Sequence, residues 1–246
     1  MKYTEEDLMS LIGRIPSLNK ETMDEIYARW DKKAKPLGSL GRLEDMVAVL
    51  GGIFQTVTPD PGKKAVIVMA GDNGVVEEGV AQSDYHVTTT VPCNMTHEDA
   101  TVAILARLNG ADVFPVDIGM YEDVDCPGVI PRKVCHGTAN MTKGPAMTRE
   151  QAVEAVWTGI HMIMDLKKQG YGLFATGEMG IGNTTTSSAV ASVLLDCPVE
   201  KVTGRGAGLS SQGLVRKIHA IKTAIAVNHP DPEDILDVIS KVGGLD

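Results

Sequence analysis

Positive charge is scarce in this chain of 246 residues. Lysine and arginine number 23 against 32 aspartate and glutamate residues, which gives a formal net charge of −9. Because no basic stripe offsets this acidic balance, electrostatic binding to nucleic acid or to an anionic membrane surface is not expected. The composition therefore favours a small molecule as the partner.

Cysteines and long hydrophobic runs are scarce as well. The four cysteines have irregular spacing, which matches neither a disulfide framework nor a zinc knuckle. No window reaches the length of a membrane span, and the opening segment MKYTEEDLMS carries acidic residues where a secretion signal has basic ones. The six histidines show no metal-ligand spacing. We expect a cytoplasmic protein that holds neither a metal nor a cofactor.

The first sixty residues have a helical rhythm. Apolar residues between Leu8 and Ile12 share one face, the pattern continues over residues 21–33, and a third run covers residues 40–54. Ser39 stands before the third run, where it would cap a helix. We predict a small helical domain over residues 1–60.

From Lys64 onward, short apolar runs alternate with longer segments of helical period. The runs are residues 65–70, 111–116 and 172–176, and the helical segments include residues 149–168 and 212–227. Continuous apolar runs suit strands that are covered on both faces. The alternation predicts an α/β domain over residues 61–246, with a parallel sheet, helices on both faces and ligand loops at the carboxyl ends of the strands.

The end of the chain predicts one more helix. Asp231 would cap it, Pro232 would lie in its first turn, and the acidic residues that follow suit the helix dipole. The chain stops at GGLD just beyond this helix, where an alternating fold would add a strand. We therefore expect a C-terminal portion beyond residue 246.

The most specific motif is GEMGIGNTT, residues 177–185, between a predicted strand and a predicted helix. A glycine-rich turn at a helix N-terminus gathers backbone N–H groups around one point, and the helix dipole favours an anion there. The spacing matches neither a Walker loop nor a dinucleotide fingerprint. The predicted phosphate-binding residues of this motif are Gly177, Met179, Gly180, Ile181, Gly182, Asn183 and Thr184. The alternative is a tight turn that needs glycine for its backbone alone, but the carboxylate of Glu178 inside a neutral cradle favours a function.

A second glycine-rich segment, VTGRGAG, occupies residues 202–208, at what we predict to be the next strand-to-helix junction. Gly204, Arg205 and Gly206 of this segment, with Lys217 in the following helix, could enclose a phosphate from the other side. A solvated helix face for Lys217 and a surface position for Arg205 stay open as alternatives.

Two carboxylates follow neighbouring predicted strands. Asp72 lies just past the first strand and Asp117 lies at the matching end of the second. Such carboxylates bind ribose hydroxyls or orient a substrate, or they accept hydrogen bonds from loop N–H groups. We favour substrate contact for Asp72 and loop capping for Asp117.

Five motifs, KPLGSLGRLE, AGDNGVVEEGV, HGTANM, GEMGIGNTT and VTGRGAG, occur in this order over nearly the whole chain. Together they resemble the nicotinate-nucleotide:dimethylbenzimidazole phosphoribosyltransferase family, and GEMGIGNTT is the most diagnostic of them. The resemblance implies a parallel α/β domain, a small helical domain contributed by both chain ends, and a homodimer, with a heterodimer as the alternative. Family members are longer than this chain, in line with the expected C-terminal portion.

The resemblance also implies a reaction. Phosphoribose would move from nicotinate mononucleotide to an aromatic base, dimethylbenzimidazole or a related one, giving α-ribazole phosphate and nicotinate in cobalamin nucleotide-loop assembly. Such a transfer needs an anchored phosphate, stabilisation of a cationic sugar and a base for the proton. Glu178 matches the family's motif glutamate and Lys217 matches a lysine near the phosphate. The family's general base is a glutamate expected beyond residue 246.

The expected base pocket departs from the family's pattern. The family usually has His where this chain has Asn73, Ser where it has Ala81, and Gln where it has Tyr85. Together with Asp72, these are the predicted base-pocket residues. The alternative function is a non-catalytic nucleotide-binding subunit of a heteromeric phosphoribosyltransferase that acts on a different base, such as a phenol.

Overall fold

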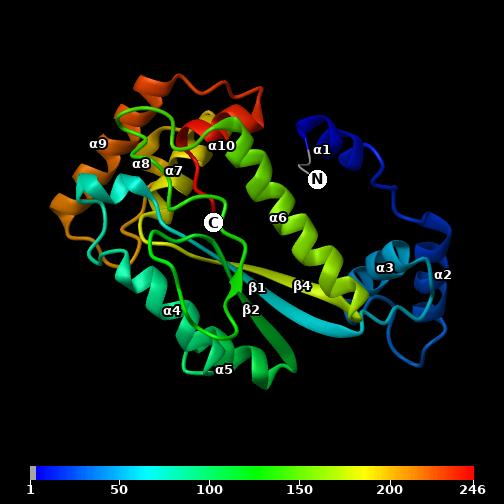
Figure 1. Ribbon diagram of the computed structural model, residues 1–246. Coiled ribbons are helices and arrows are strands. Elements are labelled where there is room, and N and C mark those ends of the chain that lie inside the picture. The colour runs from blue at the N-terminus through cyan, green and yellow to red at the C-terminus, as the bar shows by residue number, and fades with distance from the viewer. Residues whose placement is uncertain (1–3) are drawn as a thin grey trace. The chain divides into compact units, whose positions relative to one another are not determined.

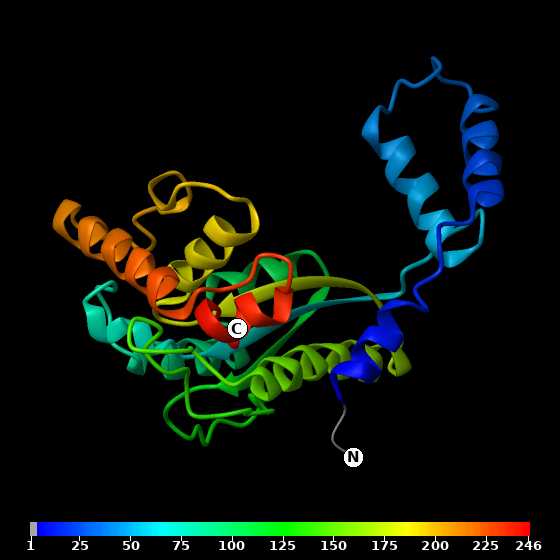
Figure 2. The same ribbon diagram turned by 90° about the horizontal axis from the view of Figure 1, so that it is seen from above.

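The computed structural model describes residues 4–246, and the chain is traced in Figures 1 and 2. Internal contacts divide these residues into two compact units. One contains residues 4–5 and Lys63–Asp246, here called the α/β unit, and the other contains Glu6–Gly62, here called the helical unit.

The helical unit contains α2 (Lys20–Asp31), α3 (Arg42–Phe54) and all but the first residue of α1 (Glu5–Ile12). The Asn19 side chain caps α2 by accepting a hydrogen bond from the backbone N–H of Thr22 at 3.0 Å. Helices α2 and α3 pack closely, because the space beside Gly51 that a side chain would fill is taken by Ile26.

The prediction that Ser39 caps the third helix is wrong. Helix α3 begins at Arg42, after Gly41, whose φ of +53° places it in the left-handed region. Ser39 instead lies in a preceding turn, where its N–H donates to the carbonyl of Pro36 at 3.2 Å. The Pro-Leu-Gly sequence makes this turn, and it delays the helix by two residues.

The α/β unit is built on a four-stranded sheet with the order β3-β2-β1-β4. Its strands are β1 (Lys63–Gly71), β2 (Ala111–Gly119), β3 (Ile130–Pro131) and β4 (Tyr171–Met179). All three strand pairs are parallel. The α/β prediction is confirmed, and the three predicted apolar runs lie inside β1, β2 and β4.

Helices cover the sheet and continue beyond its carboxyl edge. They are the 3-10 helix η1 (Gly74–Glu78), α4 (His86–Thr96), α5 (Thr101–Leu108), α6 (Arg149–Lys168), α7 (Asn183–Leu194), α8 (Val199–Val202), α9 (Ser211–Asn228) and α10 (Ile235–Val242). Met162 and Leu166 of α6 pack on Ala65 and Ile67 of β1. Figure 1 shows the sheet between α6 on one side and α4 with α5 on the other.

A second core lies at the carboxyl side of the sheet. Ala189 of α7, Ile221 of α9 and Val238 of α10 are fully buried there and pack in one cluster. Helices α7 and α9 lie side by side in both views (Figures 1 and 2). This cluster fixes the start of α7 relative to α9, which matters for the site described below.

Two local predictions in this part of the chain are wrong. Asp231 does not cap the last helix, because its carboxylate accepts the N–H of Glu233 in a turn, and Asp234 caps α10 instead. The segment VTGRGAG does not follow a strand but the short helix α8, which begins after Pro198 and buries Val199. Proline at a helix start and a single apolar contact favour a helical turn here over a strand.

No helix formed by residues 4–246 is long and apolar enough to cross a membrane.

Candidate functional site

Polar and charged groups gather at the carboxyl edge of the sheet, where β1, β2 and β4 end side by side. Asp72 follows β1, Tyr121 follows β2, and Glu178 lies in β4 opposite Met69 of β1. In open parallel sheets, this edge is where ligands bind. Within residues 4–246, no group of three His, Cys, Asp or Glu side chains is placed to hold a metal ion.

The most unusual side chain at this edge is Lys217 of α9. It is only 1% exposed, and its Nζ donates a hydrogen bond to Thr184 Oγ1 at 2.7 Å. The alternative of a solvated helix face for Lys217 is therefore wrong. Burial lowers the pKa of Lys217 below its ordinary value, because the low-dielectric interior disfavours the ammonium ion.

Gly206, in the loop before α9, faces both Thr184 and Lys217. A Cβ atom added there would lie 2.8 Å from Thr184 Oγ1 and 3.5 Å from Lys217 Nζ, so the backbone of residue 206 faces both groups directly. We call Gly182, Asn183, Thr184, Gly206 and Lys217 the anion cradle. The cradle joins a helix start, a glycine turn and a buried ammonium group around one point.

The start of α7 suits an anion. The helix begins at Asn183 behind Gly182, which has a φ of +95°, and no side chain caps it. The dipole of a helix without a side-chain cap is compensated well by a bound anion. Three N–H groups here are already used: Ile181 donates to Thr88 Oγ1 at 3.1 Å, Asn183 to the carbonyl of Gly180 at 3.2 Å, and Thr185 to that of Gly182 at 2.8 Å.

Other predicted residues of the two glycine motifs have structural surroundings. Gly177 and Met179 pair with β1 inside the sheet. Gly180 lies so close to the Gly71 carbonyl that a side chain there would clash. Arg205 is exposed, and its guanidinium donates to the carbonyl of Leu209 at 2.7 Å and to Ser211 Oγ at 3.2 Å. Gly204 of the same loop faces open space.

Three carboxyl groups lie near one another at the ends of β1 and β4. Burial raises the pKa of Asp72, which is 1% exposed, and partial enclosure of its carboxyl raises the pKa of Glu178. Burial raises the pKa of Asp246 to about 7, with the negative charges of Glu178 and Asp72 adding to the effect. A cavity of about 450 Å³ opens here, lined in part by Glu178, Asn183 and Asp246.

The predicted base-pocket residues occupy the β1 and β2 side of the edge. Asn73 is 1% exposed and lies beside the Asp246 carboxyl, where its side chain favours the ionised form of that carboxyl. Tyr85 is exposed at the start of α4, and its ring contacts the edge of the Tyr121 ring at a centroid distance of 5.7 Å. Ala81 is partly exposed. The neighbouring Gln82 Nε2 donates to the carbonyl of Gly208 at 2.6 Å, which ties this loop to the VTGRGAG segment.

Both aspartates accept hydrogen bonds from loop N–H groups, and the substrate contact that we favoured for Asp72 stays a prediction. The structure also adds Tyr121, a residue that sequence reasoning missed. Asp117 Oδ1 accepts the N–H of Met120 at 2.9 Å, which confirms its capping role. Asp72 Oδ2 accepts the N–H of Tyr121 at 2.8 Å, and the Thr88 side chain also interacts with this carboxyl. The available signal was an aromatic residue five positions past the end of the predicted strand at residues 111–116.

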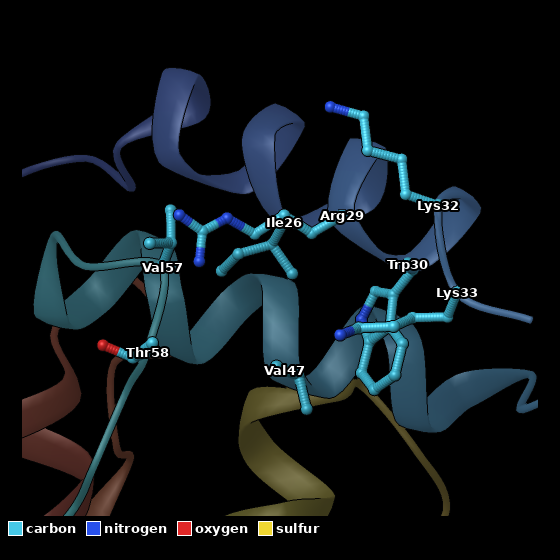
Figure 3. Close-up of a pocket in the computed structure, with 8 residues that line it drawn as sticks. All are labelled: Ile26, Arg29, Trp30, Lys32, Lys33, Val47, Val57 and Thr58. Atoms are coloured by element: carbon cyan, nitrogen blue, oxygen red, sulfur yellow. The ribbon is translucent and has the colours of Figure 1, made fainter.

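A different cavity of about 470 Å³ lies wholly within the helical unit (Figure 3). Figure 3 shows Trp30 and Lys33 at one side of it and Val57 with Thr58 at the other. Arg29, which also lines it, already pairs with Glu25 at 3.0 Å. None of the predicted site residues lines this cavity, so we place the candidate site at the sheet edge.

Comparison with known proteins identifies clear relatives. A family model described as phosphoribosyltransferase matches residues 15–246. The nicotinate-nucleotide–dimethylbenzimidazole phosphoribosyltransferase of Acetivibrio thermocellus is 50% identical over 239 residues, which cover 97% of this chain and 68% of the relative. The enzyme of the same name from Clostridium acetobutylicum is 46% identical over 240 residues, covering 98% and 68%.

Solved structures agree with these relatives. The crystal structure of CobT from Thermus thermophilus superimposes with a TM-score of 0.86 at 37% identity, covering 92% of this chain and 68% of that one. The chain thus spans about two thirds of the length of the proteins that it matches.

Proposed function

This chain belongs to the phosphoribosyltransferase family, and from that premise we propose that it transfers phosphoribose from nicotinate mononucleotide to dimethylbenzimidazole. The products would be α-ribazole phosphate and nicotinate, in cobalamin biosynthesis. The names of its relatives support this reaction. The observation that carries the proposal is the buried Lys217 ammonium facing the start of α7.

A buried lysine is costly unless a negative charge compensates it. Within residues 4–246, the hydrogen-bond partner of Lys217 Nζ is the neutral hydroxyl of Thr184, and burial alone shifts its pKa. A phosphate dianion supplies the missing counter-charge and lies where the dipole of α7 is positive. The anion cradle is therefore suited to the phosphate of a ribonucleotide.

Glu178 suits the next requirement of the transfer. The bond from C1′ of the ribose to the pyridine nitrogen breaks, a bond from C1′ to a base nitrogen forms, and positive charge develops on the sugar between these events. The carboxylate of Glu178 stabilises that charge when it is ionised. The proton of the incoming base passes to a general base, which we predict to be a glutamate beyond residue 246.

The alternative, a non-catalytic subunit that acts on a phenol, is not favoured, since the matched relatives carry the name of the dimethylbenzimidazole enzyme. We further propose that the protein works as a homodimer in the cytoplasm. Sedimentation equilibrium and cell fractionation test these two points.

The reaction itself is tested by incubating the protein with nicotinate mononucleotide and a panel of aromatic bases, and measuring nicotinate by chromatography. We expect release of nicotinate that depends on dimethylbenzimidazole and is matched by a new nucleotide product. Release of nicotinate without any base would indicate hydrolysis, and no release with any base would refute the proposal. The Lys217→Met variant tests phosphate anchoring, and Lys222→Met, at an exposed lysine of the same helix, is its matched control.

A further inference from the structure

Lys133 makes several of the contacts that hold the loop following β2. Lys133 Nζ donates to the carbonyls of Met120 at 2.9 Å and Glu122 at 2.8 Å, and to Asp123 Oδ1 at 2.8 Å. Asp117 Oδ2 lies 3.4 Å from the same nitrogen. The Lys133 side chain is 16% exposed, so these acceptors rather than water surround most of its ammonium group. We call residues 120–123 the β2 loop.

Tyr121 lies at the centre of the β2 loop and is fixed at both ends. Its N–H donates to Asp72 Oδ2 at 2.8 Å and its hydroxyl donates to the carbonyl of Thr138 at 2.9 Å. The ring passes directly over Gly137, where φ is +70° and any side chain would clash with the ring. The phenol oxygen is therefore used within the protein, and the ring is the part of Tyr121 that meets Tyr85.

The β2 loop also sets the start of α4. Glu122 accepts from His86 Nδ1 at 2.9 Å and from Thr89 Oγ1 at 3.2 Å. Tyr85 precedes His86 at the cap position of α4. As a result the rings of Tyr85 and Tyr121 meet edge to face, with an interplanar angle of 76°. Tyr85 remains 41% exposed, which leaves ring surface for a ligand.

We propose that Tyr121 is a specificity-determining residue that forms, with Tyr85, the aromatic wall of the acceptor-base subsite, and that Lys133 is the positioning residue that holds this wall. This inference rests on the function proposed above. The wall lies beside Asp72 at the same sheet edge as Glu178, so a base bound against it is near the reacting sugar. Because the Tyr121 hydroxyl is already hydrogen-bonded, the wall selects a flat apolar ring by contact.

The proposal predicts that changes in the aromatic wall weaken binding of the base and not of the nucleotide. Tyr121→Leu removes the ring, and we expect the KM for dimethylbenzimidazole to rise about tenfold. We expect the Kd for nicotinate mononucleotide to change by less than about twofold, since the anion cradle is untouched. The preference for dimethylbenzimidazole over adenine, whose edges are polar, should shrink with the same variant. Tyr121→Phe keeps the ring and should retain most of that preference.

Two further variants keep the test decisive if Tyr121→Leu folds poorly. Tyr85→Leu alters an exposed ring, so the fold is not at risk, and it should raise the KM for the base by a similar factor. Lys133→Met should also raise this KM, and Lys133→Arg should restore it in part because it keeps a cation at the carbonyls. Lys168→Met, at an exposed lysine paired with Asp165, is the matched control and should leave both constants unchanged.

The outcomes separate this inference from the proposed function. If the unaltered protein releases no nicotinate with any base, both proposals fall. If it is active and both leucine variants keep the wild-type KM for the base, the proposed function stands and the aromatic wall is refuted. Equal losses for base and nucleotide in every variant would refute the positioning role of Lys133, because they would report general damage to the fold.

Discussion

The two ends of the sheet's carboxyl edge are built in different ways. The anion cradle uses a helix start, a glycine backbone and one buried ammonium group, Lys217. The aromatic wall, in contrast, uses side chains from separate loops, which the hydrogen bonds of Lys133 and Asp72 hold in place. We thus propose that a charge is bound here by a compact backbone arrangement, while a ring is bound by a network that spans distant segments.

We expect the largest effect from a change at Glu178, which belongs to neither the anion cradle nor the aromatic wall. Glu178→Gln keeps the shape of the side chain but removes its charge, and we expect kcat to fall about 100- to 1000-fold because the cationic sugar loses its stabilisation. Affinity for both substrates should change by less than about threefold. Steady-state kinetics measure this, and an unchanged kcat with raised KM values would assign Glu178 to binding alone.

Removing the charge of Lys217 should weaken binding at the anion cradle and leave binding at the aromatic wall unchanged. Lys217→Met is expected to weaken nicotinate mononucleotide binding about 10- to 100-fold, because a charge-assisted hydrogen bond to phosphate is lost. Binding of the base should stay unchanged in calorimetry. Lys222→Met, on the exposed side of the same helix, is the control. A nucleotide affinity that is equal in both variants would contradict the cradle.

Two glycines of one loop allow a smaller and more specific perturbation. Gly206 and Gly208 both have positive φ, so alanine at either position strains the backbone by about 1 kcal/mol. The methyl group at residue 206 would meet Thr184 and Lys217, whereas at residue 208 it would meet open space. We expect about tenfold weaker nucleotide binding for Gly206→Ala alone. Equal thermal stability of the two variants, together with equal nucleotide affinity, would show that residue 206 does not face the ligand.

The smallest expected effect is a pH dependence of nucleotide binding, which arises at the anion cradle and not at the aromatic wall. Burial lowers the pKa of Lys217 in the free protein, and a bound phosphate dianion favours the ammonium form, so binding takes up a proton. Nucleotide affinity should therefore decrease several-fold as pH rises through the lowered pKa, measured above about pH 7, where the phosphate is mostly dianionic. Base affinity should not follow this trend.

Stability should change in the opposite direction over the same range. Because the pKa of Lys217 is lower in the folded protein than in the unfolded chain, the charged form opposes folding. The free energy of unfolding of the unliganded protein should therefore increase as pH rises through the folded-state pKa. Denaturant titrations of the wild type and Lys217→Met measure the difference, and parallel pH profiles would contradict it.

The sequence predicted the sheet and the motif at the start of α7 because both depend on local patterns. Apolar runs specify buried parallel strands, and the turn around Gly182 specifies a helix start without a side-chain cap. Predictions failed where a neighbouring residue offered a competing local bond. Ser39 lies in the turn after Pro36 and does not cap α3, and Asp234 rather than Asp231 caps α10.

The sequence by itself determined that the chain is a parallel α/β protein with a glycine turn before a helix that lacks a side-chain cap, since strand burial and glycine turns are encoded in short stretches of residues. Only the tertiary structure decided that Lys217 is buried against Thr184, because that depends on how α9 packs on α7. It likewise decided that Tyr121 reaches Tyr85 and Asp72. Contacts between residues far apart in the chain arise from the packing of whole elements, and no local pattern specifies them.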